Sequence, residues 1–359
     1  MKRLKENFHK PHILIIGAGI IGKFNAIELS ELGYQITIVD PFLKKNSSSA
    51  ALGLLMGNIY QKRIGRSWML RKESLQLWPK WINFLGNIDK ELTIEKPLIQ
   101  LTKNTKKFDK LKKFVKDNPR QGLEVLEENS TLIKNINNTF KTQNIKGIIS
   151  HEDGRVDPEL LLNSLDIYLK EKKIKFINTE VIKIEKLNKN WISTFKNNDK
   201  VKSDGVLICN SLNAVNLICK TYEIRLKPVL GQAIEIAADK KEVDFSYLPK
   251  HFNIDGINVI PLSKDKIIIG STDEYCEKPE ENVFERLTSF LEYKPQWLSK
   301  EKITRKWFGI RARPDGEPSP IQKNLEDGLI LCTGFYKNGF LLAPACSRWV
   351  ANELEKIFI

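Results

Sequence analysis

Glycines recur near the N-terminus at a spacing suited to binding a pyrophosphate. The segment GAGIIG places Gly17, Gly19 and Gly22 directly after the apolar run HILII. Glycines permit a tight turn and the close approach of phosphate groups, whose charge is favoured at the N-terminus of a following helix. Asp40 lies 18 residues beyond Gly22 and can accept hydrogen bonds from ribose hydroxyls. The pattern predicts a dinucleotide site made by Gly17, Gly19, Ile20, Ile21, Gly22 and Asp40. It does not separate FAD from NAD, because both contain an ADP half.

The flanking segments have the periodicity of a β-α-β unit. Residues 12–16 form a short apolar run typical of a strand buried on both faces. Residues 20–32 carry apolar side chains at helical spacing and end at Gly33, and QITIVD follows as a second strand. A tight glycine turn without a ligand is the alternative, but strand, helix, strand and acid together favour the nucleotide site.

Later segments predict an α/β chain with two styles of sheet. Asp157 and Pro158 suit the N-cap and first residue of a helix, and 204–210 resembles another buried strand. Alternating apolar runs between residues 226 and 272 instead predict a largely antiparallel sheet. We therefore expect two domains woven through one chain. A loop rich in small residues, 46–57, is expected to be shaped around a ligand.

The last third contains a strand, a glycine loop and a helix in succession. Residues 331–344 read LCTGFYKNGFLLAP, and Pro344 suits the first turn of a helix. Backbone N–H groups and the positive end of a helix dipole would suit an electron-rich group of a ligand. Asn338 and Gly339 could alternatively form a hairpin turn, but the helical spacing that follows argues against it.

Composition and charge argue against a nucleic-acid-binding protein, a metal- or disulfide-stabilised protein and a membrane protein. The chain has 359 residues and a formal charge of +14, from 58 basic and 44 acidic residues. The lysines are scattered, which indicates a solvated surface and not a nucleic-acid site. Five cysteines form no C-x-x-C pair and no cluster with histidine, so we expect neither a metal site nor disulfides. The basic N-terminus imitates a signal peptide, but the glycines and the acids that follow argue against one, and no window spans a bilayer. A cytoplasmic location is expected.

Segments along nearly the whole chain resemble the FAD-dependent D-amino acid oxidase family, most closely its glycine oxidase branch and thiamine-biosynthesis type members. The matching segments are SSAALGLL (48–55), GRVDPELLLNSL (154–165), TEVIKIE (179–185), KPVLGQ (227–232), WFGIR with PDGEP (307–318) and TGFYKNGFLLAP (333–344). The last two match the family's C-terminal signatures and are the most specific.

This resemblance implies FAD as the cofactor and names further residues that would contact it. They are Ser48, Ser49 and Ala50 against the flavin and pyrophosphate, Val181 at the adenine, and Gly334, Asn338, Gly339 and Phe340 around the flavin. Related sarcosine oxidases attach their flavin through a cysteine, and this chain has none at the matching place. The resemblance therefore implies non-covalent FAD.

The implied fold is a two-domain flavoprotein. A Rossmann-like FAD-binding domain would comprise residues 1–90, 150–222 and 303–359. A substrate domain, built on a mainly antiparallel sheet with helices, would comprise residues 91–149 and 223–302. This interleaving agrees with the change of sheet style.

Three residues are implied at the substrate. Oxidation of an amine requires orientation and electrostatics from the protein, because the flavin does the redox chemistry. Arg311 would bind a substrate carboxylate, since a guanidinium matches it with two hydrogen bonds, and Arg313 is the alternative. Lys337 replaces a common Arg of glycine oxidases or extends to solvent, and Asn258 lies where they often carry Tyr.

The implied reaction is oxidation of the C–N bond of glycine or another small amine or amino acid to an imine, with O2 or another acceptor reoxidising the flavin. The alternative is a D-amino acid dehydrogenase that passes electrons to a quinone or carrier. A tRNA-modifying flavoenzyme and a redox-silent flavin-binding protein rank lower. The sequence leaves open whether the chain forms a homo-oligomer.

Overall fold

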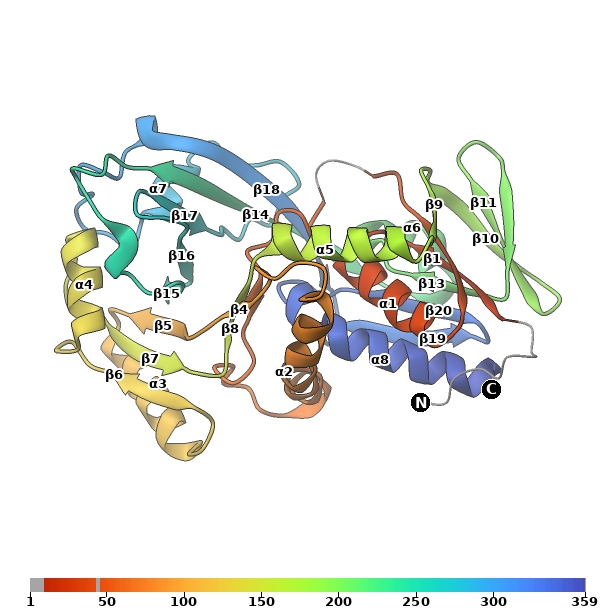
Figure 1. Ribbon diagram of the computed structural model, residues 1–359, viewed down its shortest axis with the longest axis horizontal. Coiled ribbons are helices and arrows are strands. Elements are labelled where there is room, and N and C mark those ends of the chain that lie inside the picture. Colours follow the sequence, from red (N-terminus) through yellow and green to blue (C-terminus); the bar gives the residue numbers. More distant parts are fainter. Residues whose placement is uncertain (1–9, 43–45, 359) are drawn as a thin grey trace.

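The computed structural model describes residues 10–42 and 46–358, so the basic N-terminal residues 1–9 lie outside the described part. Two lobes lie side by side along the long axis (Figure 1). The lobe at the right of the view contains a six-stranded sheet and most of helices α1 and α8, and the lobe at the left contains an eight-stranded sheet. The expected pairing of two sheet styles is confirmed.

The six-stranded sheet is parallel apart from its edge strand β19. Its order is β19 (Ile321–Glu326), β20 (Leu329–Thr333), β13 (Gly205–Ile208), β1 (His12–Ile16), β2 (Gln35–Val39) and β9 (Lys175–Ile177). The central strands are apolar because helices or other structure cover both faces of the sheet. The predicted β-α-β unit is present as β1, α1 (Ile20–Glu31) and β2.

Two further helices of this lobe follow the predicted capping signals in different degrees. α5 (Pro158–Glu171) begins as expected, with the Asp157 carboxylate accepting from the N–H groups of Glu159 and Leu160 at 2.9 and 3.2 Å. α8 (Gly339–Phe358) begins earlier than expected, because the Asn338 carbonyl already accepts from the N–H of Leu342 at 2.9 Å. The prediction that Pro344 lies in its first turn is therefore wrong.

The eight-stranded sheet is mainly antiparallel, with one parallel contact between β15 and β5. Its order is β18 (Ile303–Pro314), β14 (Leu226–Ala237), β17 (Lys266–Gly270), β16 (Ile257–Pro261), β15 (Phe252–Ile254), β5 (Leu98–Thr102), β7 (Lys146–Ser150) and β6 (Leu123–Leu126). Helices α3 (Thr105–Asp117), α4 (Thr131–Phe140) and α7 (Val283–Leu287) lie in the same lobe (Figure 1).

The remaining elements connect or flank the two sheets. They are α2 (Gly65–Leu85), α6 (Ala214–Tyr222), the three-stranded sheet β10 (Val181–Leu187), β11 (Asn190–Phe195) and β12 (Lys200–Ser203), and the small sheet β3 (Leu54–Leu55), β8 (Gly154–Val156) and β4 (Ile94–Glu95). Short 3-10 turns cover 211–213, 245–247 and 300–302. None of the helices in the described ranges is long and apolar enough to cross a membrane.

The pairing of strand β18 disagrees with one border of the predicted domains. This strand pairs with β14 from Pro314 back to Ile303, so it belongs to the eight-stranded sheet although the division above assigns 303–359 to the cofactor domain. The strand is nevertheless followed directly by β19 and β20 of the other sheet. We keep the interleaved division as a proposal and move this border to the end of β18.

Candidate active site

A cavity of about 1260 Å³ contains most of the residues predicted from the sequence, although elements of both sheets contribute to it. The predicted residues in its lining are Gly17, Gly19, Ile20, Ile21, Asp40, Ser48, Ala50, Asn258, Arg311, Gly334, Lys337, Asn338, Gly339 and Phe340. Drug-sized ligands occupy pockets of roughly 300–1,000 Å³. The volume therefore suits a dinucleotide together with a small molecule.

The glycine motif lies where β1 ends and α1 begins. Gly19 is the N-cap of α1 and has no side chain to cap the first N–H groups of the helix, of which, among the described residues, only that of Ile20 is taken, by Ser48. Gly17 has φ 109°, a conformation that favours glycine. Gly22 lies behind the turn, where a Cβ would come within 1.9 Å of the Gly17 carbonyl oxygen. Gly22 therefore allows close packing and does not line the cavity.

Two side chains fix the backbone around this turn. The Asp40 carboxylate accepts from the N–H of Ala18 at 2.7 Å and from the N–H of Phe42 at 2.6 Å. The Ser48 hydroxyl accepts from the N–H of Ile20 at 3.0 Å, which leaves its hydrogen free to donate to a ligand. Both residues line the cavity, and their contact with a cofactor stays a prediction.

The small-residue loop is held in place by buried charged groups of the β7–β8 region. The Asp153 carboxylate accepts from the N–H groups of Gly57, Asn58 and Ile59 at 2.6 to 2.9 Å. Burial raises the pKa of Asp153, against the effect of these hydrogen bonds. Arg155 donates to the Leu52 carbonyl at 3.0 Å. Charge-assisted bonds of this kind hold a loop that has little regular structure apart from the short strand β3.

Besides Gly22, two predicted cofactor residues do not line the cavity. Ser49 is exposed, and its hydroxyl donates to the carbonyl of Asn46 at 3.1 Å. Val181 is buried at the start of β10, where it pairs with Phe195. Their contacts with a cofactor stay predictions.

The C-terminal glycine loop is fixed by a residue that the sequence did not reveal. Arg71 of α2 is buried and donates to the Asn338 side chain at 2.8 Å and to the Met56 carbonyl at 2.6 Å. Its guanidinium lies 3.9 Å from the centre of the Tyr60 ring. Arg71 and Asn338 are 267 positions apart, so no local pattern could have paired them.

Two cations of the cavity lining, Arg311 and Lys337, form ion pairs with the same carboxylate, that of Asp273. Arg311 donates to the Asp273 carboxylate at 2.9 Å, and Lys337 forms an ion pair with its other oxygen. Burial lowers the pKa of Arg311, and the nearby Asp273 opposes that shift. Arg313 does not line the cavity but is exposed and donates to the Tyr275 hydroxyl at 2.7 Å. Asp273 was not predicted, because one acid after a strand gives no distinctive signal.

Asn258 belongs to a buried polar group on β15 and β16. Its side-chain oxygen accepts from Asn253 at 3.0 Å and contacts His251 Nε2 at 3.2 Å. Because that oxygen can only accept, His251 must carry its hydrogen on Nε2. Asn258 also lines the cavity, so this group fixes one wall.

Three comparisons with known proteins agree with this geometry. The model of the family "FAD dependent oxidoreductase" matches residues 12–353. The chain belongs to this family. It is 25% identical to a glycine oxidase of Pseudomonas aeruginosa, over 96% of this chain and 94% of that protein.

Solved structures show the same fold. The glycine oxidase of Bacillus cereus ATCC 14579 superposes with a TM-score of 0.81 at 20% identity, covering 97% of this chain and 98% of that one. The L-alpha-glycerophosphate oxidase of Mycoplasma pneumoniae, solved with FAD bound, gives 0.80 at 17% identity, covering 97% and 95%. The family match thus makes the chain an FAD-dependent oxidoreductase, and the solved structures agree with its mixed α/β fold, both as predicted.

The cavity fits FAD on its own chemistry. A side chain at Gly19 would come within 3.1 Å of the Ser48 hydroxyl, so the glycine keeps the approach to the helix terminus open. The buried side-chain oxygen of Asn210, also in the lining, has no hydrogen-bond partner among the described residues. A buried polar atom without a partner is costly unless a ligand or water satisfies it. The cradle at α1 would thus hold the pyrophosphate, and Asp40 the ribose.

Gly231 provides a test of how Arg311 is placed. A Cβ at this position of β14 would lie 2.0 Å from Arg311 Nη2, so Gly231→Ala is expected to push the guanidinium away. Because the displaced atoms end a flexible side chain, the melting temperature should change little. We expect KM for a carboxylate-bearing substrate to rise about tenfold. Adding Gly231→Ala to Arg311→Ala should raise KM no further, and a further rise would contradict this explanation.

His251 provides a pH test. Its side chain is fully buried, and burial lowers its pKa to about 4. As pH falls from 6.5 towards 4, the unfolded chain binds a proton at His251 that the folded chain does not. The free energy of unfolding should therefore drop by about 3 kcal/mol from this group. Urea unfolding at several pH values should show a smaller drop for His251→Gln, and an equal drop would refute the assignment.

Proposed function

We propose that the chain oxidises the C–N bond of a small amine or amino acid, in the manner of a glycine oxidase. The observation that carries the proposal is the pair of cations Arg311 and Lys337. Both line the cavity that contains the glycine cradle, and both bind the carboxylate of Asp273 beside it. FAD, when bound, would supply the redox chemistry by accepting a hydride. Two of the relatives named above are glycine oxidases, which supports the same reaction class.

The residues of the chain would contribute binding and orientation. Arg311 would bind the substrate carboxylate, and Lys337 would add a second positive charge at the same side. Asn258, fixed by its buried partners, would present a neutral wall to the substrate. Holding the amine in one geometry against the cofactor can supply much of the rate enhancement. The product would be an imine, which water hydrolyses to an oxo acid and ammonia.

The test is to purify the protein with FAD and to record its absorbance spectrum while candidate amines are added without oxygen. We expect glycine or another small amine to bleach the flavin absorbance. If a panel of amines and amino acids fails to reduce a flavin that dithionite reduces, the proposal is wrong, and a redox-silent flavin-binding protein becomes the better explanation.

A second assay identifies the electron acceptor. Peroxide formation with a reducing substrate would identify an oxidase, whereas reduction of a dye or quinone without peroxide would identify a dehydrogenase. A dehydrogenase would use the same cavity, so the geometry does not separate the two. A cytoplasmic location, non-covalent attachment of FAD and homo-oligomer formation remain predictions from the sequence.

A further inference from the structure

Asp273 forms ion pairs with both of the cations that would bind a substrate carboxylate. One of its oxygens accepts from Arg311 at 2.9 Å, and the other forms the ion pair with Lys337. A substrate carboxylate would use the same donors. The three charges sum to +1, so the site attracts an anion less strongly than two unpaired cations would.

The backbone of Asp273 is fixed on both sides. Thr272 donates its N–H to the Gln232 carbonyl at 3.1 Å, and Glu274 donates its N–H to the Leu230 carbonyl at 2.9 Å. Both bonds join the segment to β14. Arg286 also donates to the carbonyl of Asp273 at 3.1 Å. Asp273 is exposed, with 40% of its side chain accessible, but its backbone is held beside Arg311 by these neighbours.

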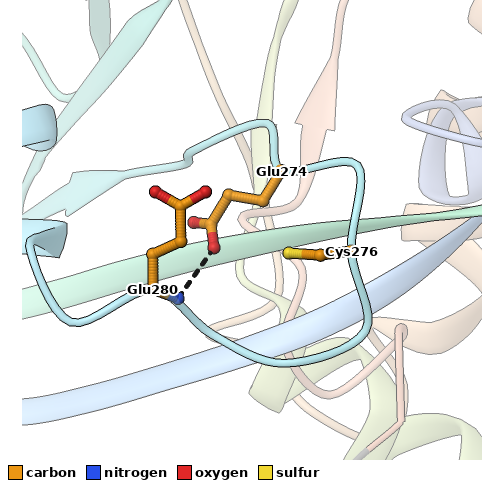
Figure 2. Close-up of side chains that lie close together, drawn as sticks. All are labelled: Glu274, Cys276 and Glu280. Carbon is orange, nitrogen blue, oxygen red and sulfur yellow. Dashed lines mark hydrogen bonds between the residues drawn. The ribbon is translucent and has the colours of Figure 1, made fainter.

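The buried carboxylate of Glu274 anchors this segment. Figure 2 shows Glu274, Cys276 and Glu280 together, and their possible ligand atoms lie within 4.8 Å of one another. The oxygens of Glu274, however, already accept from Thr272, from the Gln232 amide at 3.1 and 3.3 Å, and from the N–H of Glu280 at 3.0 Å. The cluster thus has a structural role in the turn after Asp273.

Arg311 does not need Asp273 to stay in place. Its guanidinium also donates to the Ser271 hydroxyl at 2.6 Å and to the Thr272 carbonyl at 3.1 Å. Only 15% of its side chain is exposed. Removing the negative charge of Asp273 should therefore leave the arginine near its present position, with a donor released for a substrate. Loss of this charge is therefore expected to strengthen the binding of a substrate carboxylate.

We propose that Asp273 is a specificity-determining residue that weakens the hold of the site on a substrate carboxylate and so extends the substrate range to amines that lack one. This inference rests on the proposed amine oxidation. With Asp273 present, the chain prefers a carboxylate-bearing amine over its neutral analogue less strongly than it would if Arg311 and Lys337 had no acid beside them. The effect is electrostatic, since like charges close together disfavour binding.

The first experiment measures binding and needs no turnover. Acetate, as the smallest carboxylate probe, is titrated into the FAD-bound protein while the flavin spectrum is followed. We expect Asp273→Asn to bind acetate about tenfold more tightly than the unchanged chain. The control is Asp117→Asn, which removes an acid paired with Lys113 at 3.1 Å on α3, outside the cavity lining, and should leave the affinity unchanged. Equal or weaker binding by Asp273→Asn overturns the proposal.

The second experiment compares glycine with glycinamide, which has nearly the same shape but no negative charge. Asp273→Asn should raise the ratio of their kcat/KM values about tenfold in favour of glycine. A merely structural role would change both substrates alike and leave the ratio unchanged, which would contradict the proposal. If no amine reduces the flavin, the proposed function fails, while the acetate titration still decides the role of Asp273.

Discussion

Replacing Arg311 with alanine is expected to raise KM for an amino acid about 100-fold while FAD stays bound. The substitution removes the more buried of the two cations that pair with Asp273 and leaves the acid with Lys337. Loss of a charge-assisted pair of hydrogen bonds, together with an unpaired acid, costs about 3 kcal/mol. Steady-state kinetics and the ratio of flavin to protein absorbance measure the two effects.

Arg313→Ala is the matched control for this prediction. Arg313 lies two residues along β18 but is exposed and bonded to Tyr275, so its loss should change KM little. A large rise for Arg313→Ala, with an unchanged KM for Arg311→Ala, would transfer the carboxylate site to Arg313. Equal effects of both variants would show that the edge of the cavity acts only through its total charge.

Gly22→Ala is expected to destabilise the fold strongly and to prevent FAD binding. The new Cβ would lie 1.9 Å from the Gly17 carbonyl oxygen, and that turn cannot retreat freely because the Gly17 N–H donates to the Val39 carbonyl at 2.8 Å. Overpacking against backbone typically costs about 1–3 kcal/mol, and the upper end is expected here. Chemical unfolding and retained flavin measure the outcome.

Gly339→Ala is the control for the free energy of unfolding. A Cβ there would meet its nearest neighbour, Ile20, at 3.7 Å, which is an ordinary contact. Its free energy of unfolding should remain within about 0.5 kcal/mol of the unchanged chain. If both glycine variants unfold equally easily, the close packing behind the first turn is not what makes Gly22 necessary.

The cofactor side of the site could be predicted because its signals are local. Gly17, Gly19 and Asp40 lie within one β-α-β unit, and the chemistry of a glycine turn before a helix is the same wherever it occurs. The cap of α5 was predictable for the same reason, since Asp157 and Pro158 act on adjacent backbone groups. Local geometry, set by neighbours in the chain, can be read from residue types.

The substrate side could be predicted only in part, because its contacts join distant segments. Arg311 and Lys337 came from resemblance to a family, and nothing in the sequence indicated that Asp273 would pair with both. The partnership of Arg71 with the last loop was missed for the same reason. The start of α8 is predicted too late because proline normally marks the first turn of a helix, whereas Pro344 lies inside this one.

The strand order of the six-stranded sheet has a consequence for synthesis of the chain. β1 lies between β2, which follows it closely, and β13, which in turn pairs with β20 near the C-terminus. Until β13 has been made, a growing chain therefore carries its glycine turn beside a sheet that lacks at least half of its six strands. Such long-range pairing slows folding and leaves edges exposed to wrong partners. Because residues 332–340 also line the cavity, its wall is complete only when almost the whole polypeptide has been made.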